Sequence, residues 1–558
     1  MNHLFKPCLI LLSLLFASCS AVKDIAQYQP VYQGYSLNQP ALVVGITVDQ
    51  MRFDYLTKYW DDYSDEGFKR LIAEGFLCKN HHFSYAPTYT GPGHASIYTG
   101  TTPANHGIVG NNWYDRATKR GVYCSEDSTV FGIGDTTTAG EMSPKNMIVS
   151  TITDELKLFS NMRSKTIGIS IKDRGAILPA GHMADAAYWF TGNKDGNFIS
   201  SSYYMEELPN WVAEFNTSGY KDSLLATGWE LLKPAESYEE SIEDNNPYEA
   251  KYSGKLQPTF PYNFSELADS NGYYNLIKGS PLGNELVTDF ALQCIKNEQL
   301  GKDQYCDFLA MSFSSTDYVG HQFAPTAIES QDTYLRLDLQ IAKLLQRLDN
   351  EVGFGNYTIF LTADHGAVHN PNYLKKNGIP AGYFKGDQVT MVVDTAVKKA
   401  FGVEGIIESY SNNQLFLSDS VITTHHLIKA EVEQVVSEAA LTYEGVFSTL
   451  TRTQLLNTHY TSGVNEILQE GFNQKLSGDV LVVPRPAWMS YPTTGTSHGS
   501  PFNYDTHVPL LFYGYGITPG FTNSETHIKD IAPTVAALLG IQMPNATTGS
   551  PILPVIGQ

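Results

Sequence analysis

Carboxylate and imidazole side chains of the kind that bind metal ions recur along this sequence, most of them shortly after apolar runs. Taken singly they predict little, because an Asp after a strand is often a helix N-cap and a lone His is usually structural. Shared between two ions, six such ligands would suit Zn²⁺ and would leave open coordination positions for a substrate. The set therefore predicts a site for two Zn²⁺, with another divalent ion as the alternative. Its members are Asp49, Asp317, His321, Asp364, His365 and His498.

A threonine in a glycine-rich segment is the candidate nucleophile. The segment from Thr88 to His94 reads Thr-Tyr-Thr-Gly-Pro-Gly-His, and Pro92 suits the first turn of a helix. We therefore expect Thr90 at a helix N-terminus, where backbone N–H groups and the helix dipole favour an anion. Coordination to a metal would ionise its hydroxyl, so Thr90 is also a candidate metal ligand. Without the other ligands, a helix-capping role for this Thr would be the preferred interpretation.

The elements that must position these side chains follow from hydrophobic periodicity. Apolar runs, four of them followed within a few residues by a charged side chain, predict buried strands, and helical patterns lie between some of them. This alternation predicts an α/β fold with a doubly wound, mostly parallel sheet flanked by helices. Ligands bind such sheets outside the carboxyl ends of the strands, where the charged residues stand. The predicted strands are Ala41 to Val48, Thr166 to Ile171, Phe308 to Phe313, Tyr357 to Leu361 and Val508 to Tyr513, and the predicted helices are Glu66 to Glu74, Met147 to Phe159, Thr326 to Val352 and His527 to Leu539.

Two stretches interrupt the alternation and predict a discontinuous core. Residues 40–190, 283–385 and 480–558 are assigned to the catalytic core. Residues 191–282, rich in Tyr, Asn, Glu and Ser, and residues 386–479, with an amphipathic helical pattern, are assigned to insertions near the active site. Insertions of this length either cap a site or decorate the surface, and both interpretations stay open.

The N-terminal residues 1–19 have the features of an export signal. A cationic Lys6 precedes an apolar run from Cys8 to Phe16, which is too short to cross a bilayer. Small residues then lead to Cys19, as in a bacterial lipoprotein processing box, although Phe16 is atypical there. We expect an exported protein, either periplasmic or held at the outer membrane by a lipid on Cys19; a plain cleaved signal peptide is the alternative.

Charge and cysteine content narrow the chemistry further. The formal net charge of −21 disfavours nucleic acid as a partner, because a polyanion would be repelled. Four cysteines remain after the leader, and in an exported protein this number suggests two disulfides. Proximity favours Cys294 with Cys306 and Cys78 with Cys124, although three connectivities exist. Their scatter argues against a cysteine zinc site.

Five segments, in this order along the chain, resemble the bacterial alkaline phosphatases with a threonine nucleophile, the PafA-like branch of the alkaline phosphatase superfamily. The resemblance extends from Asp49 to His498, which is most of the chain beyond the leader. Its segments are Thr-Tyr-Thr-Gly-Pro-Gly-His at Thr88, Lys-Asp-Arg-Gly-Ala at Lys172, Ser-Thr-Asp-Tyr-Val-Gly-His at Ser315, Thr-Ala-Asp-His-Gly at Thr362 and Thr-Ser-His-Gly-Ser at Thr496.

The resemblance implies an activity and a role for each matched residue. It implies hydrolysis of small phosphate monoesters through a phosphothreonine at Thr90, which releases inorganic phosphate and an alcohol. One zinc would be bound by Asp317, His321 and His498 and would contact the leaving-group oxygen. The other would be bound by Asp49, Asp364 and His365 and would activate Thr90.

Three further residues match family groups that contact the phosphoryl oxygens. Asn111 resembles the family asparagine, and Lys172 and Arg174 resemble the pair that favours monoesters over diesters. The physical reason is charge, since a monoester dianion keeps oxygens free for cationic donors while a diester fills one position with a second organic group. Without the resemblance, a solvated turn would explain Lys172 and Arg174 equally well. The remaining histidines are not assigned to metal; His94, His106 and His182 are expected in supporting loops.

Three alternative activities are compatible with parts of this pattern. A nucleotide pyrophosphatase/phosphodiesterase shares the fold, the two zincs, the threonine and the asparagine, and Lys172 with Arg174 argues against it. A sulfatase is excluded, since no cysteine begins the Cys-x-Pro-x-Arg segment that matures to formylglycine. A non-catalytic lipoprotein that binds phosphorylated ligands is disfavoured because every matched position is present, although fold alone never guarantees activity.

Overall fold

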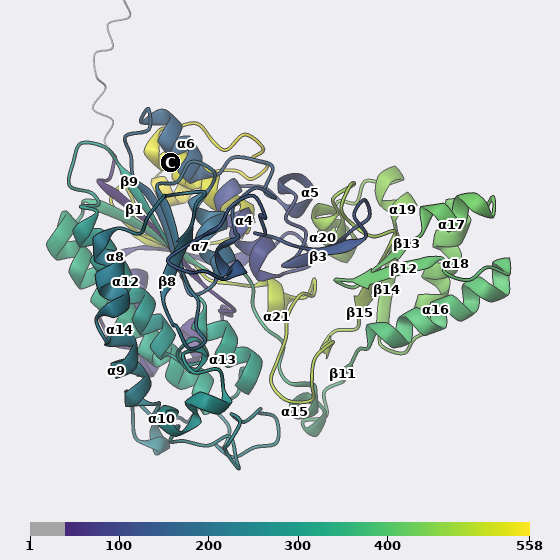
Figure 1. The fold of residues 1–558 in the computed structure, drawn as a ribbon, viewed down its shortest axis with the longest axis horizontal. Coiled ribbons are helices and arrows are strands. Elements are labelled where there is room, and N and C mark those ends of the chain that lie inside the picture. The colour runs from purple at the N-terminus through teal and green to yellow at the C-terminus, as the bar shows by residue number, and fades with distance from the viewer. Residues whose placement is uncertain (1–38, 558) are drawn as a thin grey trace, which may run out of the picture. The chain divides into compact units, whose positions relative to one another are not determined.

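A ten-stranded mixed sheet forms the centre of the computed structural model, which describes residues 39–557 (Figure 1). Strands β10, β1, β9, β6 and β7 are parallel neighbours, as predicted, while β17, β8 and β5 are antiparallel to theirs. The predicted leader, with Cys19, lies outside the described residues. In spatial order the strands are β18 (Gly520–His527), β2 (Phe76–His82), β17 (Leu510–Gly514), β10 (Tyr357–Thr362), β1 (Leu42–Val48), β9 (Asp307–Phe313), β6 (Thr166–Ser170), β7 (Ala186–Phe190), β8 (Phe198–Ser201) and β5 (Gly132–Ile133).

Helices flank this sheet, which confirms the predicted α/β class. One group packs together as α4 (Thr90–Thr99), α6 (Ile152–Phe159), α7 (Asp173–Ala180) and α22 (Ile531–Leu539). Another contains α3 (Phe68–Glu74), α12 (Leu282–Asn297), α13 (Ser315–Phe323) and α14 (Ile328–Leu348). Every residue of β1, β9 and β10 is buried, as expected of strands covered on both faces.

Two predicted helices are shorter than their hydrophobic patterns. The pattern from Met147 becomes helical only at Ile152, because the Thr151 and Asp154 side chains form a capping box with each other's backbone N–H groups. The pattern that ends at Val352 leaves the α-helix at Leu348 and continues as one π-helical turn, Asp349–Gly353. A capping box and a π-helical turn therefore set boundaries that periodicity does not reveal.

The segment 191–282 adds to the main sheet and to its core. Strand β8 pairs with β7, and Trp229, Tyr262 and Phe264 are buried in the main hydrophobic cluster. Its helices are α8 (Asn210–Thr217), α9 (Tyr220–Thr227), α10 (Phe264–Leu267) and α11 (Asn275–Lys278).

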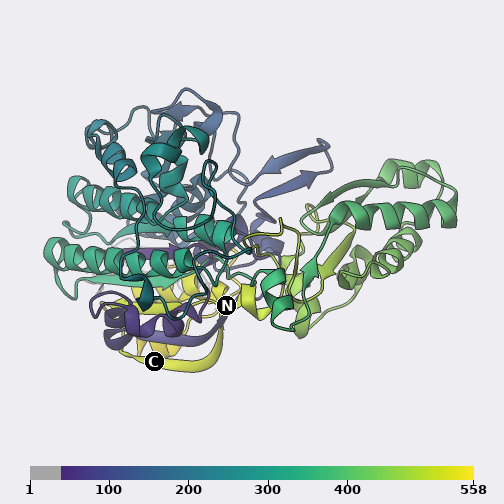
Figure 2. The same cartoon turned by 90° about the horizontal axis from the view of Figure 1, so that it is seen from below.

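The segment 386–479 contains the helices that its amphipathic pattern indicated, and together with the strand that directly follows it, it forms a sheet that periodicity did not reveal. Helices α16 (Gly386–Phe401) and α18 (Lys429–Leu441) pack on a four-stranded sheet in the order β12 (Ile407–Ser411), β13 (Gln414–Leu417), β15 (Val480–Pro484) and β14 (Val446–Thr451), green in Figure 2. Residues such as Val389 and Val432 form a separate core there, so this region has a hydrophobic interior of its own. The remaining elements are α2 (Tyr55–Lys58), α5 (Pro103–His106), β3 (Asn112–Asp115), β4 (Arg120–Tyr123), α15 (Pro371–Lys376), β11 (Gly382–Tyr383), α17 (Asp419–Thr424), α19 (Arg452–Asn457), α20 (Gly463–Gly471), β16 (Trp488–Met489) and α21 (Asn503–Thr506), besides short 3₁₀ turns.

The disulfide prediction is wrong. Cys78, Cys124, Cys294 and Cys306 are all free and buried. Each lies on a separate element: Cys78 in β2, Cys124 after β4, Cys294 in α12 and Cys306 just before β9. Sequence proximity does not bring their Cβ atoms into bonding geometry, and each thiol packs as a small apolar side chain. Among residues 39–557, no helix is long and apolar enough to cross a membrane.

Candidate active site

The register of the central strands brings the predicted site residues to one edge of the sheet. Val48 of β1 is level with Phe313 of β9, and Ser170 of β6 is level with Ser312 of β9. On the other side, Thr47 of β1 is level with Thr362 of β10. Four parallel strands therefore end together, and the residues that follow them converge: Asp49, Lys172, Asp317 and Asp364 with His365.

One group of metal-ligand atoms surrounds Asp317. Asp317 and His321 lie one turn apart on α13, and His321 Nε2 is 3.2 Å from Asp317 Oδ1. His498, which follows β16, places its Nε2 3.8 Å from the same oxygen. These three residues form one of two groups whose donor atoms lie close enough to hold an ion.

A second group surrounds Asp49. His365 Nε2 lies 3.4 Å from Asp49 Oδ1 and 3.7 Å from Asp364 Oδ2, and all three side chains are fully buried. Asp49, Asp317 and His365 form the second compact set of donor atoms, with Asp317 in the place predicted for Asp364, so Asp317 belongs to both groups. Within the described chain, these two are the sets of three or more such donors in metal-binding range. The two groups together form a His/Asp cluster that is suited to hold two metal ions.

The donor atoms are arranged as metal ligands require. In His321, His498 and His365, Nδ1 bonds to the backbone carbonyls of Thr496, Thr88 and Gly366, at 2.8, 2.7 and 3.0 Å. Each Nδ1 is then the donor, which leaves the Nε2 lone pair directed at the carboxylates. Asp49 Oδ1, Asp364 Oδ2 and His365 Nε2 are buried without a hydrogen-bond partner in residues 39–557. Because unpaired buried acceptors are costly, a divalent cation fits this site.

Burial and charge set the protonation of the cluster. Burial lowers the pKa of His365 to about 3, so the imidazole is neutral and can coordinate an ion. Burial opposes ionisation of Asp317, but the charges of His321 and Lys172 outweigh it and hold the Asp317 pKa well below its ordinary value. Burial and the neighbouring Asp49 carboxylate raise the pKa of Asp364 well above its ordinary value. A bound cation would relieve the repulsion between the Asp49 and Asp364 carboxylates that these shifts reflect.

Thr90 is the first residue of α4 and is buried. The first turn packs directly on the metal cluster, since a Cβ at Gly93 would lie 2.5 Å from the Asp364 carbonyl oxygen. The Gly91 N–H donates to Asn111 Oδ1 at 2.7 Å. This bond turns the Asn111 NH₂ group away from Gly91 and leaves it available as a donor.

His94 belongs to the same helix rather than to a loop. Its Nδ1 is 2.9 Å from the Thr90 carbonyl, its Nε2 is 2.9 Å from Ser312 Oγ, and its Nδ1 is 3.4 Å from Asp364 Oδ2. His106 is likewise helical, in α5, and His182 contacts the Val149 carbonyl. None of the three joins a set of metal-ligand atoms in the described chain, as expected.

Lys172 is a buried cation and Arg174 a partly buried one, and the two have different partners. Lys172 Nζ lies 2.6 Å from Asp49 Oδ2 and 2.6 Å from Asp317 Oδ2, between the two ligand groups. Arg174 Nη1 donates to the Tyr123 hydroxyl at 3.1 Å, and that hydroxyl donates to Asp173 at 2.5 Å. Arg174 Nε is buried without a partner in the described residues, so the guanidinium retains a free donor.

Sequence reasoning missed Gln50. It follows Asp49 directly, and its backbone adopts a positive φ of 63°. Its N–H donates to Asp364 Oδ1 at 3.1 Å, and its Nε2 donates to Asp317 Oδ1 at 2.6 Å. One residue thus orients two carboxylates of the site. Its position directly after Asp49, at the end of a predicted strand, is the sequence feature that could have identified it.

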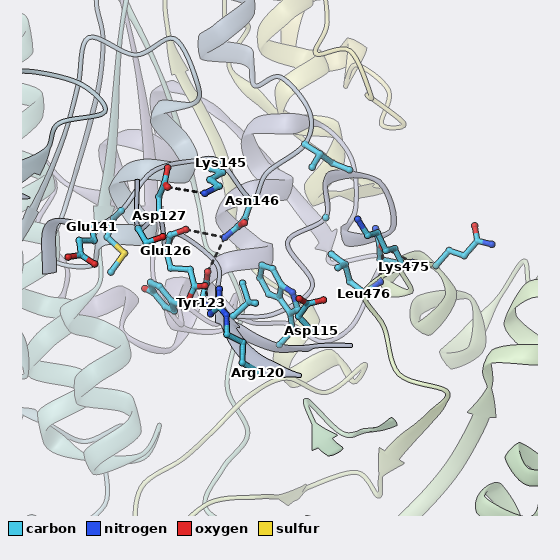
Figure 3. A pocket seen from close by; sticks show the side chains of 18 of the residues that line it. Asp115, Arg120, Tyr123, Glu126, Asp127, Glu141, Lys145, Asn146, Lys475 and Leu476 are labelled. Carbon is cyan, nitrogen blue, oxygen red and sulfur yellow. Dashed lines mark hydrogen bonds and ion pairs between the residues drawn. The ribbon is translucent and has the colours of Figure 1, made fainter. Parts of the chain in front are cut away.

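A large cavity of about 1060 Å³ lies beside this site without containing its ligands (Figure 3). It is lined by the β3 and β4 hairpin, the segment 126–148 and residues 473–476. Two of its lining residues, Lys145 and Asp127, form an ion pair. Another lining residue, Tyr123, accepts a hydrogen bond from Arg174 and so connects the cavity with the active site. The chemistry therefore belongs to the strand ends and not to this larger space.

Comparisons with known proteins agree with the geometry. Residues 43–507 match the family model for type I phosphodiesterase / nucleotide pyrophosphatase. A Myroides odoratus protein described as a calcium-transporting ATPase is 46% identical over 94% of this chain and 96% of its own. Alkaline phosphatase PhoV of Synechococcus elongatus is 42% identical over 98% of this chain and 99% of its own. Alkaline phosphatase PafA of Elizabethkingia meningoseptica is 41% identical over 93% and 95%.

Solved structures of PafA show the same fold. The wild-type crystal structure superposes with a TM-score of 0.89 at 41% identity, covering 93% of this chain and 99% of that one. Another PafA structure, also with a TM-score of 0.89, carries substitutions at one Thr, one Asn, one Lys and one Arg. The chain thus belongs to the type I phosphodiesterase/nucleotide pyrophosphatase family and, within it, to the PafA- and PhoV-like alkaline phosphatases, which are phosphomonoesterases.

Proposed function

We propose that the chain hydrolyses phosphate monoesters through a phosphothreonine at Thr90, with two Zn²⁺ ions held by the two ligand groups. The observation that carries this proposal is the packing of α4: its N-terminal residue is Thr90, and its first turn contacts Asp364 of the metal cluster. Imidazole and carboxylate donors without a thiolate suit zinc. Bound there, zinc would supply Lewis-acid polarisation of the attacking and leaving oxygens.

The side chains of this site then perform a two-step transfer. Thr90 Oγ loses its proton to solvent and attacks phosphorus in line with the leaving group, the bond from phosphorus to the ester oxygen breaks, and the departing oxygen takes up a proton to leave as the alcohol. The positive end of the α4 helix dipole and the Asn111 amide stabilise the charge on the phosphoryl oxygens. Water then attacks the phosphothreonine, the bond from phosphorus to Thr90 Oγ breaks, and inorganic phosphate leaves while the threonine is restored.

Specificity for monoesters rests on Lys172 and Arg174 in this proposal. A monoester offers them dianionic oxygens, whereas a diester replaces one oxygen with a second organic group. The mutated residue types in the second PafA structure, Thr, Asn, Lys and Arg, are those at Thr90, Asn111, Lys172 and Arg174. This agreement supports the assignment of these four residues to the transferred phosphoryl group.

Matched monoester and diester substrates test the proposal on the zinc-loaded mature protein. Thr90→Ala should abolish monoester turnover, and Thr90→Ser should restore part of it because the hydroxyl nucleophile returns. The double variant Lys172→Ala/Arg174→Ala should reduce the monoester preference. A native preference for the diester would instead assign a phosphodiesterase, and a zinc-loaded protein without turnover would assign a binding protein. About two zinc ions per chain, and loss of turnover on chelation, are the accompanying expectations.

We further propose that residues 1–19 direct export, with Cys19 as the lipidated residue or as part of a cleaved leader. The proposal rests on the order of cationic, apolar and small residues in this segment. Intact mass and N-terminal sequence of the mature protein distinguish a diacylglyceryl cysteine from an unmodified N-terminus.

A further inference from the structure

A pocket of about 440 Å³ borders the helix that carries two metal ligands. Its polar lining consists of tyrosines, amides and one lysine, and none of its lining residues, all within the described chain, carries a carboxylate. This composition stands out in a chain with a net charge of −21. The polar lining residues are Tyr252, Asn271, Asn275, Lys278, Tyr318 and Gln322.

Helix α13 connects the pocket with the metal cluster. Asp317 and His321 lie one turn apart on it and belong to one ligand group. Tyr318 and Gln322, the residues that follow each of them, line the pocket. Since successive residues project about 100° apart around a helix, the pocket lies against the neighbouring face of the same two turns. In the proposed function this ligand group contacts the leaving-group oxygen, so the pocket lies on the leaving-group side.

Lys278 is the cation of this pocket. Its Nζ lies 5.8 Å from the centre of the Tyr318 ring, and Nζ of Lys172 lies 5.0 Å from the centre of the same ring. The Lys278 stem packs closely on the chain at Gly192, where an added Cβ would lie 2.9 Å from Lys278 Cδ. One aromatic ring therefore joins the lysine of the pocket to the lysine of the active site.

Most donors of the pocket are already engaged, but Lys278 is not. The side-chain amides of Asn271, Asn275 and Gln322 bond to Ser253, Asn193 and Ala250. Lys278 and Tyr318 are both partly buried. In contrast to the amides, neither the Lys278 ammonium nor the Tyr318 hydroxyl has a hydrogen-bond or ion-pair partner in residues 39–557. The pocket therefore offers one uncompensated positive charge and one hydroxyl donor.

We propose that this pocket is a subsite for the leaving group of monoesters whose alcohol carries a second anion, either a phosphate or a carboxylate. Lys278 binds that anion by charge, with the Tyr318 hydroxyl as a second donor. This inference rests on the proposed function, because it extends the same active site along the departing alcohol. Lys278 sets the preference between substrates and takes no part in the transfer itself.

Three alkyl phosphates of equal chain length test the subsite: butyl phosphate and its analogues with a terminal carboxylate or a terminal phosphate. We expect wild-type kcat/KM to be about tenfold higher for the anionic analogues, after correction for the two equivalent ends of the bisphosphate, and to lose this advantage with added salt. Lys278→Ala should reduce the ratio to about twofold or less, and Lys278→Glu should invert it. Lys296→Ala, on an exposed lysine of α12, is the matched control and should leave the ratio unchanged.

The outcomes are distinguishable. Equal kcat/KM values for all three substrates in the wild type would overturn the subsite, as would a preference that survives Lys278→Ala. A preference for either anion that depends on Lys278 supports it and identifies which anion the pocket takes. Failure of the wild type to hydrolyse butyl phosphate itself would overturn the proposed function rather than the subsite alone.

Discussion

Lys172 Nζ bridges the two ligand groups, 2.6 Å from Asp49 Oδ2 and 2.6 Å from Asp317 Oδ2. Burial works against this ammonium, but the two carboxylates outweigh it and raise the Lys172 pKa above its ordinary value. The ammonium therefore occupies two carboxylates that divalent cations would also use, and in the proposed function it contacts the transferred phosphoryl group.

Replacement of Lys172 by Ala should separate substrate recognition from metal binding. We expect kcat/KM for a monoester to fall by about 10²- to 10³-fold, the usual cost of one charge-stabilising donor. Zinc affinity should stay equal or rise, because no ammonium then competes for Asp49 and Asp317. Activity assays and chelator-competition titrations measure the two effects. A parallel loss of zinc would show instead that Lys172 organises the ligands.

The orientation of Asn111 leads to a second prediction. Its Oδ1 accepts the Gly91 N–H, so its NH₂ group is the end available to a phosphoryl oxygen. Asn111→Asp keeps the shape and the bond to Gly91 but removes the donor and adds a negative charge. We expect kcat/KM to fall by at least about 10²-fold while thermal stability and zinc content change little. Unchanged turnover would exclude Asn111 from the phosphoryl site.

The contact between α4 and the metal cluster can be tested at a glycine. A Cβ at Gly93 would lie 2.5 Å from the Asp364 carbonyl oxygen and 2.7 Å from Asp364 Cβ, so Gly93→Ala must displace the helix or the ligand. We expect loss of most activity together with weakened zinc binding. Gly121→Ala, where an added Cβ meets nothing within 4 Å, is the control and should match the wild type. Normal zinc binding in Gly93→Ala would contradict the packing.

A buried pair of glutamates predicts how stability changes with pH. Burial, and for Glu249 also the charge of Glu329, raises both pKa values above the ordinary value of 4.5. A carboxyl group with a raised folded pKa stabilises the fold fully below its unfolded pKa, and this contribution is lost as the pH rises through the folded pKa. The fold should therefore lose stability from about pH 4.5 into the alkaline range.

Glu249→Gln removes one ionisable member of this pair. We expect its Tm to exceed that of the wild type at pH 9 by about 2 °C, with a smaller difference at pH 5. Thermal unfolding at the two pH values gives the measurement, and Glu266→Gln, at an exposed glutamate, is the control. A variant that loses equal stability at both pH values would contradict the predicted ionisation.

The sequence by itself determined the α/β class, because local hydrophobic periodicity indicates buried strands and amphipathic helices. It also indicated the candidate ligands, since carboxylates and imidazoles just beyond strand ends must meet at one edge of a parallel sheet. Asp49, Asp364 and His365 illustrate this, because register alone brings them together.

Only the tertiary structure decided features that depend on residues distant in sequence. The four buried cysteines are free thiols, which their spacing along the chain did not reveal. Gln50 touches both ligand groups only because its positive φ turns it toward Asp317 and Asp364. The Lys278 pocket likewise exists only where α11 meets α13, and no periodicity or spacing reports such a meeting.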